Sequence, residues 1–257
     1  MPARPVATPP PQRLLSSRRT ALGALGALSA TPLLGLPDAA LAADAWDEDF
    51  SASQIATARS CALIPQETEG PYPLSSVLDD PSKVRRDITE GRTGVAMGLA
   101  LKLVDVNNGC APIANAAVYI WHCDKDGVYS GYSQPGNDTR GETFLRGVQV
   151  SNAKGIVRFT SIYPGWYSGR ITHVHFQVYL NDNTGAAATA TSQIAFPQDV
   201  TQAVYASPLY AAHGQNTSVR SFAADNVFSD GTTYQMATLK GSVAKGYAAK
   251  LLVGVSA

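Results

Sequence analysis

Short segments with apolar residues at alternate positions follow one another through most of the sequence after residue 95. This spacing is typical of β-strands, because successive side chains on a strand point to opposite faces. No helical period of comparable strength occurs in the same region. We therefore expect an all-β fold, either an antiparallel β-sandwich or an open barrel, and favour the sandwich, with long loops and little helix. The segments cover residues 95–106, 117–121, 148–150, 156–162, 171–180 and 249–255.

The N-terminus has the features of an export signal. Arg18 and Arg19 precede an apolar, glycine-rich stretch, and Ala-Leu-Ala at residues 40–42 fits a signal-peptidase site. The paired arginines and the weak hydrophobicity of the stretch resemble the twin-arginine type of signal, with an ordinary secretory signal as the alternative. Pro32 and Pro37 interrupt the stretch, which argues against a stable membrane anchor.

We accordingly divide the chain into an export signal over residues 1–42, a linker over 43–60 and one folded domain over 61–257. The product would be exported to the periplasm or the exterior of a bacterial cell. Twenty basic residues balance twenty acidic ones. This neutral total gives no electrostatic reason to expect nucleic acid or an anionic membrane surface as a partner.

Three cysteines, Cys61, Cys110 and Cys123, lie in the expected domain. An oxidising destination permits a disulfide, and an odd number leaves one thiol over. Cys110 and Cys123 flank an expected hairpin or strand start, so we favour this pair. Three buried thiols are the alternative.

The segment over residues 171–180 carries two histidines on one face. Alternation places His173, His175 and Gln177 together, and two imidazoles at this spacing can converge on one metal ion. A structural pair of histidines is the alternative when the pattern is taken alone. The other face of this segment is apolar and would point to a core through Val174, Phe176, Val178 and Leu180.

Two turn-rich loops place tyrosines near this histidine pair. Tyr167 follows a Pro-Gly turn just before the strand, and Tyr129 ends a loop that follows the 117–121 segment. Deprotonated tyrosine is an oxygen ligand, and a hard trivalent cation supplies the driving force for the loss of the proton. No Asp or Glu stands beside the histidines, so the carboxylate triad of ferrous oxygenases is not indicated.

Five blocks, in this order, resemble the intradiol ring-cleavage dioxygenases, the family of the protocatechuate, catechol and hydroxyquinol dioxygenases. The resemblance extends over about residues 61–257. It implies a non-haem enzyme with one Fe(III) per chain that opens catechol-type rings with O2 between the two hydroxylated carbons, giving a muconate-type dicarboxylic acid. The blocks are TEGPYPL at 68–74, AAVYIWHCDKDGVYSGY at 116–132, FLRGVQV at 144–150, IYPGWYSGRITHVHF at 162–176 and TSQIAF at 191–196.

The resemblance also assigns roles to single residues. It implies four iron ligands, of which one, Tyr167, leaves the metal when substrate binds and accepts a substrate proton. Arg170 and Gln193 would be catalytic residues that line the reaction site. The implied ligands are Tyr129, Tyr167, His173 and His175, and the residues expected to bind substrate are Thr68, Gly70, Pro71, Tyr72 and Trp166, the last as core or pocket wall.

Two departures from the family pattern limit what is carried over. Only five residues separate Tyr167 from His173, where protocatechuate-type enzymes have a longer insertion that helps to hold the ring carboxylate. The chain also lacks the long helical N-terminal region of typical catechol dioxygenases, so their dimer mode is not implied, and a homo-oligomer stays open. An exported β-sandwich binding module of the transthyretin type, without catalytic metal, is the alternative to the enzyme.

Overall fold

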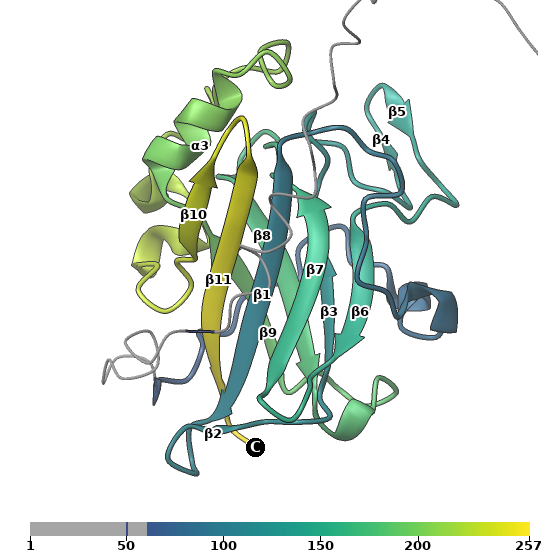
Figure 1. Cartoon of the computed structure of the whole chain (residues 1–257). Helices are drawn as coiled ribbons and strands as arrows, with labels where there is room; N and C mark the ends of the chain where they lie inside the picture. The colour runs from purple at the N-terminus through teal and green to yellow at the C-terminus, as the bar shows by residue number, and fades with distance from the viewer. Residues whose placement is uncertain (1–49, 51–60) are drawn as a thin grey trace, which may run out of the picture. The chain divides into compact units, whose positions relative to one another are not determined.

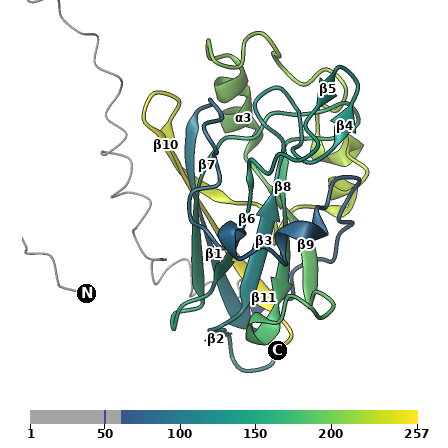
Figure 2. The ribbon, with the colours of Figure 1, turned by 90° about the vertical axis from the view of Figure 1, so that its right-hand side faces the viewer.

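The structure is a computed structural model that describes Phe50 and residues 61–257. The predicted export signal over 1–42 and nearly all of the predicted linker over 43–60 lie outside the described residues. Two β-sheets lie face to face as a sandwich, with α3 and the β4–β5 hairpin at the same end (Figures 1 and 2). The predicted all-β sandwich is confirmed.

The first sheet has the order β10-β11-β1-β2, and β7 pairs with the earlier part of β1 on the same edge as β2. The second sheet has the order β6-β3-β8-β9. The bounds in the first sheet are β1 Ala96–Asp105, β2 Ala111–Pro112, β7 Ile156–Ile162, β10 Thr238–Ser242 and β11 Gly246–Val255. The bounds in the second sheet are β3 Ala117–Trp121, β6 Arg146–Val150, β8 His173–Tyr179 and β9 Ala190–Ala195. A hairpin of β4 Ser133–Gln134 and β5 Asn137–Asp138 stands apart.

One pairing departs from the expected antiparallel sandwich. β1 and β11 run parallel, from Met97 opposite Tyr247 to Asp105 opposite Val255, while the other strand pairs within the sheets are antiparallel. A parallel neighbour needs a long crossover. Here nearly the whole domain is the crossover, because β1 is the first of these strands and β11 the last.

The helical elements are short. α3 spans Gln198–Tyr205, begins after Pro197 and buries Thr201, Val204 and Tyr205. Eight residues are too few to give a clear helical period in the sequence, which is why α3 was not expected. The 3-10 turns span Ser75–Val77, Pro81–Lys83, Leu180–Asp182, Phe222–Ala224 and Phe228–Asp230. In the described part of the chain, no helix has the length and apolar character needed to span a bilayer.

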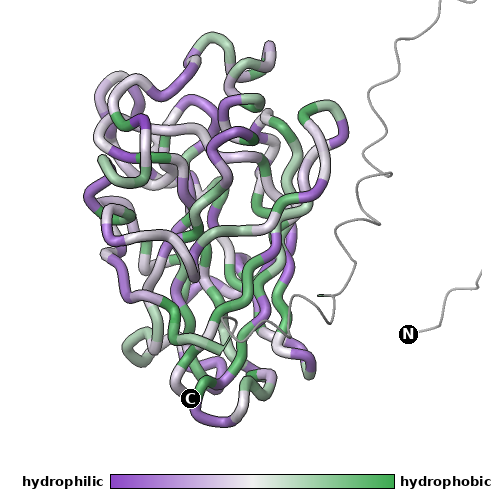
Figure 3. The backbone as a smooth tube through the Cα atoms, turned by 90° about the vertical axis from the view of Figure 1, so that its left-hand side faces the viewer, coloured by the Kyte–Doolittle hydropathy of each residue, from purple (hydrophilic) through white to green (hydrophobic). Residues whose placement is uncertain are grey.

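The core lies between the two sheets and follows the predicted alternation. Figure 3 shows apolar residues gathered along the strands and hydrophilic residues along many of the loops. Each large apolar side chain that is fully buried contributes roughly 1.5–3 kcal/mol to folding. The inward-facing residues include Met97, Leu99, Leu101 and Leu103 from β1, Val118 and Ile120 from β3, and Val174, Phe176 and Val178 from β8.

The disulfide joins Cys61 to Cys110, so the expected Cys110–Cys123 pair is wrong. The segment after Cys61 pairs with the end of β11, where Ile64 N donates to Gly254 O, and β11 lies beside the end of β1. This places Cys61 beside the turn that holds Cys110, with 5.6 Å between the two Cα atoms. Cys123 is a buried free thiol instead. Closing a 49-residue separation stabilises the fold by about 4 kcal/mol on the chain-entropy model.

Candidate metal centre and substrate cleft

The two histidines of β8 form the centre of the candidate site. His173 and His175 lie on the face of β8 that points away from the core between the sheets, and both are almost fully buried. Their Nε2 atoms are 3.0 Å apart. His173 Nδ1 lies 2.6 Å from Ile171 O, and donation to this carbonyl leaves the lone pair on Nε2 for a ligand. The predicted convergence of the two imidazoles is therefore present in the fold.

Two tyrosines complete a set of four donors around these nitrogens. Tyr129 Oη lies 3.3 Å from His173 Nε2, and its ring is fully buried. Tyr167 presents its ring edge-on to both Tyr129 and His173, with 5.7 Å between ring centroids in each pair. The rings of the four predicted ligands thus form one cluster, although they come from two loops and one strand.

The loop that carries Tyr129 is held from within by a carboxylate. Asp124 Oδ1 accepts the backbone N–H groups of Asp126 and Val128, each at 3.0 Å. Tyr129 N donates to Gln134 Oε1 at 2.7 Å, which ties the loop to the β4–β5 hairpin. These local bonds fix the position of Tyr129, the predicted ligand that lies on this loop.

Burial keeps all four donors uncharged in the protein alone. Burial, followed by the cation of Arg170, lowers the pKa of His173 to about 3, and burial also holds the pKa of His175 well below its usual value. Burial raises the pKa of Tyr167 to about 12 and that of Tyr129 well above its ordinary value. Neutral imidazoles are ready ligands, and the phenols need a strong Lewis acid to lose their protons. The donor set therefore fits a hard, highly charged metal ion such as Fe(III).

No group of three or more His, Cys, Asp and Glu side chains that could hold a metal occurs among the described residues. The candidate site is not a group of this kind, because two of its four donors are the phenols of Tyr129 and Tyr167.

His175 is held between an indole and a glycine. Its ring stacks on Trp121, with 4.8 Å between centroids and 2° between planes, and Trp121 lies opposite it in the β3–β8 register. On another side, a Cβ added to Gly70 would come within 3.1 Å of His175 Cε1. Trp121 and Gly70 thus fix the orientation of the ring. His175 Nδ1 is buried without a hydrogen-bond partner, so packing does this work alone.

Arg170 and Gln193, the two residues expected beside the metal, are hydrogen-bonded to each other. Arg170 Nη2 donates to Gln193 Oε1 at 2.7 Å, and Gln193 Nε2 donates to Thr68 O at 2.9 Å. Gln193 lies opposite His175 in the β8–β9 register. This chain of bonds connects the strand pair under the metal centre to the TEGPYPL loop.

Asp225 is a site residue that the sequence did not indicate. It is fully buried and accepts from Arg170 Nε with both oxygens, at 3.0 and 3.3 Å. It also accepts the backbone N–H groups of Ile171, Val227 and Phe228. Burial raises the pKa of Asp225. The hydrogen bonds that its carboxylate accepts, of which that from Arg170 has the largest effect, lower the pKa by more, so that it lies below its usual value. No motif surrounds Asp225, so only the fold could show its role.

The TEGPYPL loop lies against the two tyrosines that are predicted to be ligands, Tyr129 and Tyr167. Tyr72 stacks on Tyr129, with 4.7 Å between centroids and 26° between planes. Arg146, fully buried, donates to Tyr72 O at 2.8 Å and to Ser130 O at 2.8 Å, so that it joins this loop to the loop of Tyr129. The loop therefore forms a wall beside the metal donors, as the resemblance implied.

A cleft of about 470 Å³ opens beside Tyr167 and Arg170. Thr68, Gly70 and Pro71 are on its wall, so these expected substrate contacts come together there. Trp166 is not among its lining residues in the described structure. The indole nitrogen of Trp166 donates to Gly214 O at 2.9 Å and its ring packs on His213. The remaining lining residues are Tyr167, Ser168, Gly169, Arg170, Asn226 and Val227.

Comparison with known proteins agrees with this architecture. The model of a family described as Dioxygenase matches residues 68–238, which is more than half of the chain. The chain belongs to the intradiol ring-cleavage dioxygenase family. It is accordingly an enzyme of the intradiol aromatic ring-cleaving class. A search of curated protein sequences gave no significant match.

Two solved structures illustrate the range of similarity. An intradiol ring-cleavage dioxygenase from Tetranychus urticae is 29% identical, with a TM-score of 0.64, over 76% of this chain and 95% of that one. A hydroxyquinol 1,2-dioxygenase from Pseudomonas putida DLL-E4 is 14% identical, with a TM-score of 0.52, over 75% of this chain and 66% of that one. The second comparison shows the shared fold alone.

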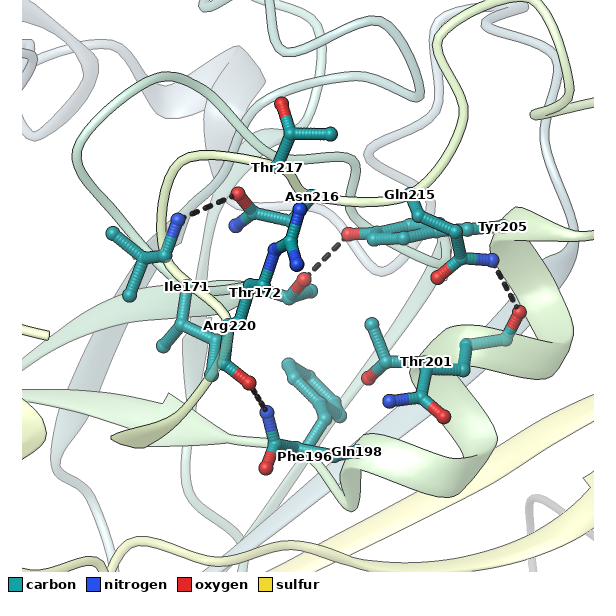
Figure 4. Close-up of a pocket in the computed structure, with 12 residues that line it drawn as sticks. Ile171, Thr172, Phe196, Gln198, Thr201, Tyr205, Gln215, Asn216, Thr217 and Arg220 are labelled. Carbon is teal, nitrogen blue, oxygen red and sulfur yellow. Dashed lines mark hydrogen bonds between the residues drawn. The ribbon is translucent and has the colours of Figure 1, made fainter. Parts of the chain in front are cut away.

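A second cavity of about 410 Å³ lies between the start of β8, α3 and the segment around Asn216 (Figure 4). Thr172 points into it and bonds Tyr205 Oη at 2.5 Å, while the next residue, His173, faces the metal donors. Thr172 lines this cavity and His173, the first residue of β8, belongs to the candidate metal donors, so the backbone between them separates the two places.

Gly70 permits a direct test of how His175 is held in this dioxygenase. Gly70 has φ +69° and Gly91 has φ +77°, but an added Cβ meets His175 only at Gly70, since nothing lies within 4 Å at Gly91. Each change to alanine should cost about 1–2 kcal/mol through left-handed backbone strain. We expect Gly70→Ala alone to lower iron affinity as well, measured by competition with a chelator.

The Gly91→Ala protein is the matched control, because it carries the same backbone strain without the ring contact. Equal iron affinity in the two variants would show that Gly70 does not position His175.

Proposed function

We propose that this dioxygenase uses one non-haem Fe(III) to open the ring of a catechol-type aromatic between its two hydroxylated carbons with O2, which gives a muconate-type dicarboxylic acid. The observation that carries this proposal is the meeting of two buried imidazoles and two phenols around the 3.0 Å gap between His173 Nε2 and His175 Nε2. Membership of the intradiol family supports it.

The residues fit a ferric ion by charge as well as by position. Tyr129 and Tyr167 would bind as phenolates, and His173 and His175 as neutral imidazoles. Two phenolates offset much of the ferric charge in a buried site, which favours the ferric over the ferrous state. When bound, the ion acts as a Lewis acid that draws electron density from a catecholate.

Tyr167 and Tyr129 differ in a way that gives them separate tasks. Tyr167 is half-buried and lines the cleft, whereas Tyr129 is fully buried beneath Tyr72. Only Tyr167 can meet an entering substrate. Its phenolate oxygen would accept a proton from a catechol hydroxyl, while Tyr129 stays in place as a permanent ligand.

Arg170 and Gln193 prepare the site for negative charge. Asp225 and Gln193 hold the guanidinium of Arg170 before any substrate arrives. A donor that is fixed in advance in a partly dry site stabilises charge that develops on the substrate without a cost of reorganisation. Gln193 keeps one amide nitrogen on Thr68 O and thereby maintains the cleft wall.

The direct experiment is to express residues 43–257, determine the iron content and follow O2 uptake with a panel of catechols. We expect about one iron per chain, a red-brown colour from tyrosinate-to-iron charge transfer, and a dicarboxylic product with the mass of substrate plus O2. Colourless protein with full iron would contradict the tyrosine ligands.

Two further outcomes separate the alternatives. Absence of iron after reconstitution with ferrous and ferric salts would support a transthyretin-like binding module instead. A product cleaved outside the two hydroxylated carbons would show extradiol cleavage and contradict the proposed reaction.

A further inference from the structure

The cleft beside the metal donors offers no free positive charge to a substrate. Among the described residues that line it, Arg170 is the one cationic side chain. Its Nε is bonded to both oxygens of the fully buried Asp225, and the pair is neutral as a unit. The polar groups of Ser168 and Asn226, both exposed, are uncharged. A carboxylate that entered here would lose water and would meet no cation among these described lining residues except Arg170, whose charge Asp225 already balances.

Glu69 brings a negative charge close to the metal donors. It lies between two cleft residues, Thr68 and Gly70, and its Oε2 accepts from Gln177 Nε2 at 3.3 Å. Gln177 shares the face of β8 with His175, two residues away, a separation of about 6.6 Å along a strand. The carboxylate therefore lies over the same row of side chains that holds the metal ligands.

Two more carboxylates lie close in sequence to residues that line the cleft. Asp230 is exposed and ends the 3-10 turn that follows Val227, a lining residue. Glu67 is bonded to Gln235 Nε2 at 3.0 Å. Burial raises the pKa of Glu67 most, and the charges of Asp230 and Asp225 add to the rise, which places these carboxylates within electrostatic reach of one another.

We infer that the substrates of this enzyme are catechols whose ring substituent is neutral or cationic, and that catechols whose substituent carries a carboxylate are disfavoured. The inference rests on the proposed function, because it concerns the same cleft. The small side chains of Ser168 and Gly169 leave room for a substituent, and the carboxylates next to the lining residues, Glu69 first, would select its charge.

The expected size of this selection follows from Coulomb's law. One carboxylate about 8 Å from a charged substituent changes the affinity for that substrate by about twofold at an effective dielectric constant of about 80. At an effective dielectric constant of about 20 the change is about thirty-fold. Glu69 and Asp230 act together, so a tenfold or larger preference is expected at low salt. Part of this preference should disappear near 1 M salt, where the Debye length is only about 3 Å.

The experiment compares three 4-substituted catechols of similar size with the iron-loaded enzyme. They are 3,4-dihydroxyphenylacetate, its neutral amide, and the cationic 4-(2-aminoethyl)catechol. We expect kcat/KM, from O2 uptake, to be at least about tenfold higher for the amide and the amine than for the acid.

Three variants test the cause of this preference. The double variant Glu69→Gln with Asp230→Asn should reduce the amine-to-acid ratio several-fold. Ser168→Lys should raise kcat/KM for the acid. Asp182→Asn is the control for the loss of a carboxylate away from the cleft, because it removes one negative charge just beyond the end of β8, in a left-handed conformation that asparagine tolerates. It should leave the ratio unchanged.

The outcomes distinguish this inference from the proposed function. Turnover of the acid at least as fast as the amide, or a ratio that neither the double variant nor salt changes, would overturn the charge selection alone. An iron-loaded enzyme that turns over none of the three would contradict the proposed reaction itself.

Discussion

His175→Ala is expected to remove both iron and activity. The imidazole supplies one of four donors, with its Nε2 3.0 Å from that of His173, and no side chain in the immediate register can replace it, since Trp121 and Gln193 lie opposite. Loss of a partner that merely orients a ligand typically costs about 10–100-fold in metal affinity. Loss of the ligand itself should exceed this, and iron content after dialysis should fall well below one tenth of an equivalent.

His213→Ala provides the matched control. His213 is half-buried, its Nε2 lies 2.7 Å from Trp166 O, and it takes no part in the donor set. Its replacement should leave iron content and the tyrosinate absorption band near those of the parent protein. Retention of iron and ring cleavage by His175→Ala, with a normal melting curve, would show that the metal lies elsewhere.

Asp225→Asn is expected to destabilise the fold and to impair catalysis at the same time. The change leaves the buried guanidinium of Arg170 without its counter-charge, and breaking a buried pair in this way costs about 3–5 kcal/mol. For a domain of this size the midpoint of thermal unfolding should fall by roughly 10 °C. The exposed pair of Asp138 and Arg140 gives the comparison, and Asp138→Asn should scarcely change the midpoint.

A double variant separates the two effects of Asp225. Arg170→Met together with Asp225→Asn removes the unpaired cation, so part of the lost stability should return, while kcat/KM with catechol stays low because the guanidinium is absent. Recovery of both would mean that Arg170 has no role in the reaction. A wild-type melting midpoint for Asp225→Asn alone would mean that the pair does not stabilise the fold.

The strand pattern was sufficient to predict the histidine pair. Alternation along residues 171–180 separates His173 and His175 from Val174 and Phe176, and the structure has the same division. The predicted bounds of β3 and β7 also agree, because each is a compact run of β-branched or aromatic residues. β9 and β10 were not expected, since their polar residues conceal the alternation that marks a half-buried strand.

Residues whose roles depend on pairing between distant segments were beyond such reasoning. Trp121 is buried, and only the β3–β8 register shows that its indole lies against His175. The disulfide was assigned to the wrong pair because the pairing of Ile64 with the end of β11 was not visible. Nothing near Asp225 in the sequence indicates that it binds a guanidinium 55 residues away.

The sequence by itself determined most of the long sheet-forming segments and the side of β8 that carries its imidazoles. Through ordered blocks of family-like residues it also predicts the four metal donors. These are properties of local periodicity and residue type. Only the tertiary structure decided that His175 packs between Gly70 and Trp121, that Asp225 neutralises Arg170, and that Glu69 bonds to Gln177 on the face of β8 that carries the histidines. Those contacts join residues far apart in the chain, and their positions follow from strand register and loop packing, which no local pattern specifies.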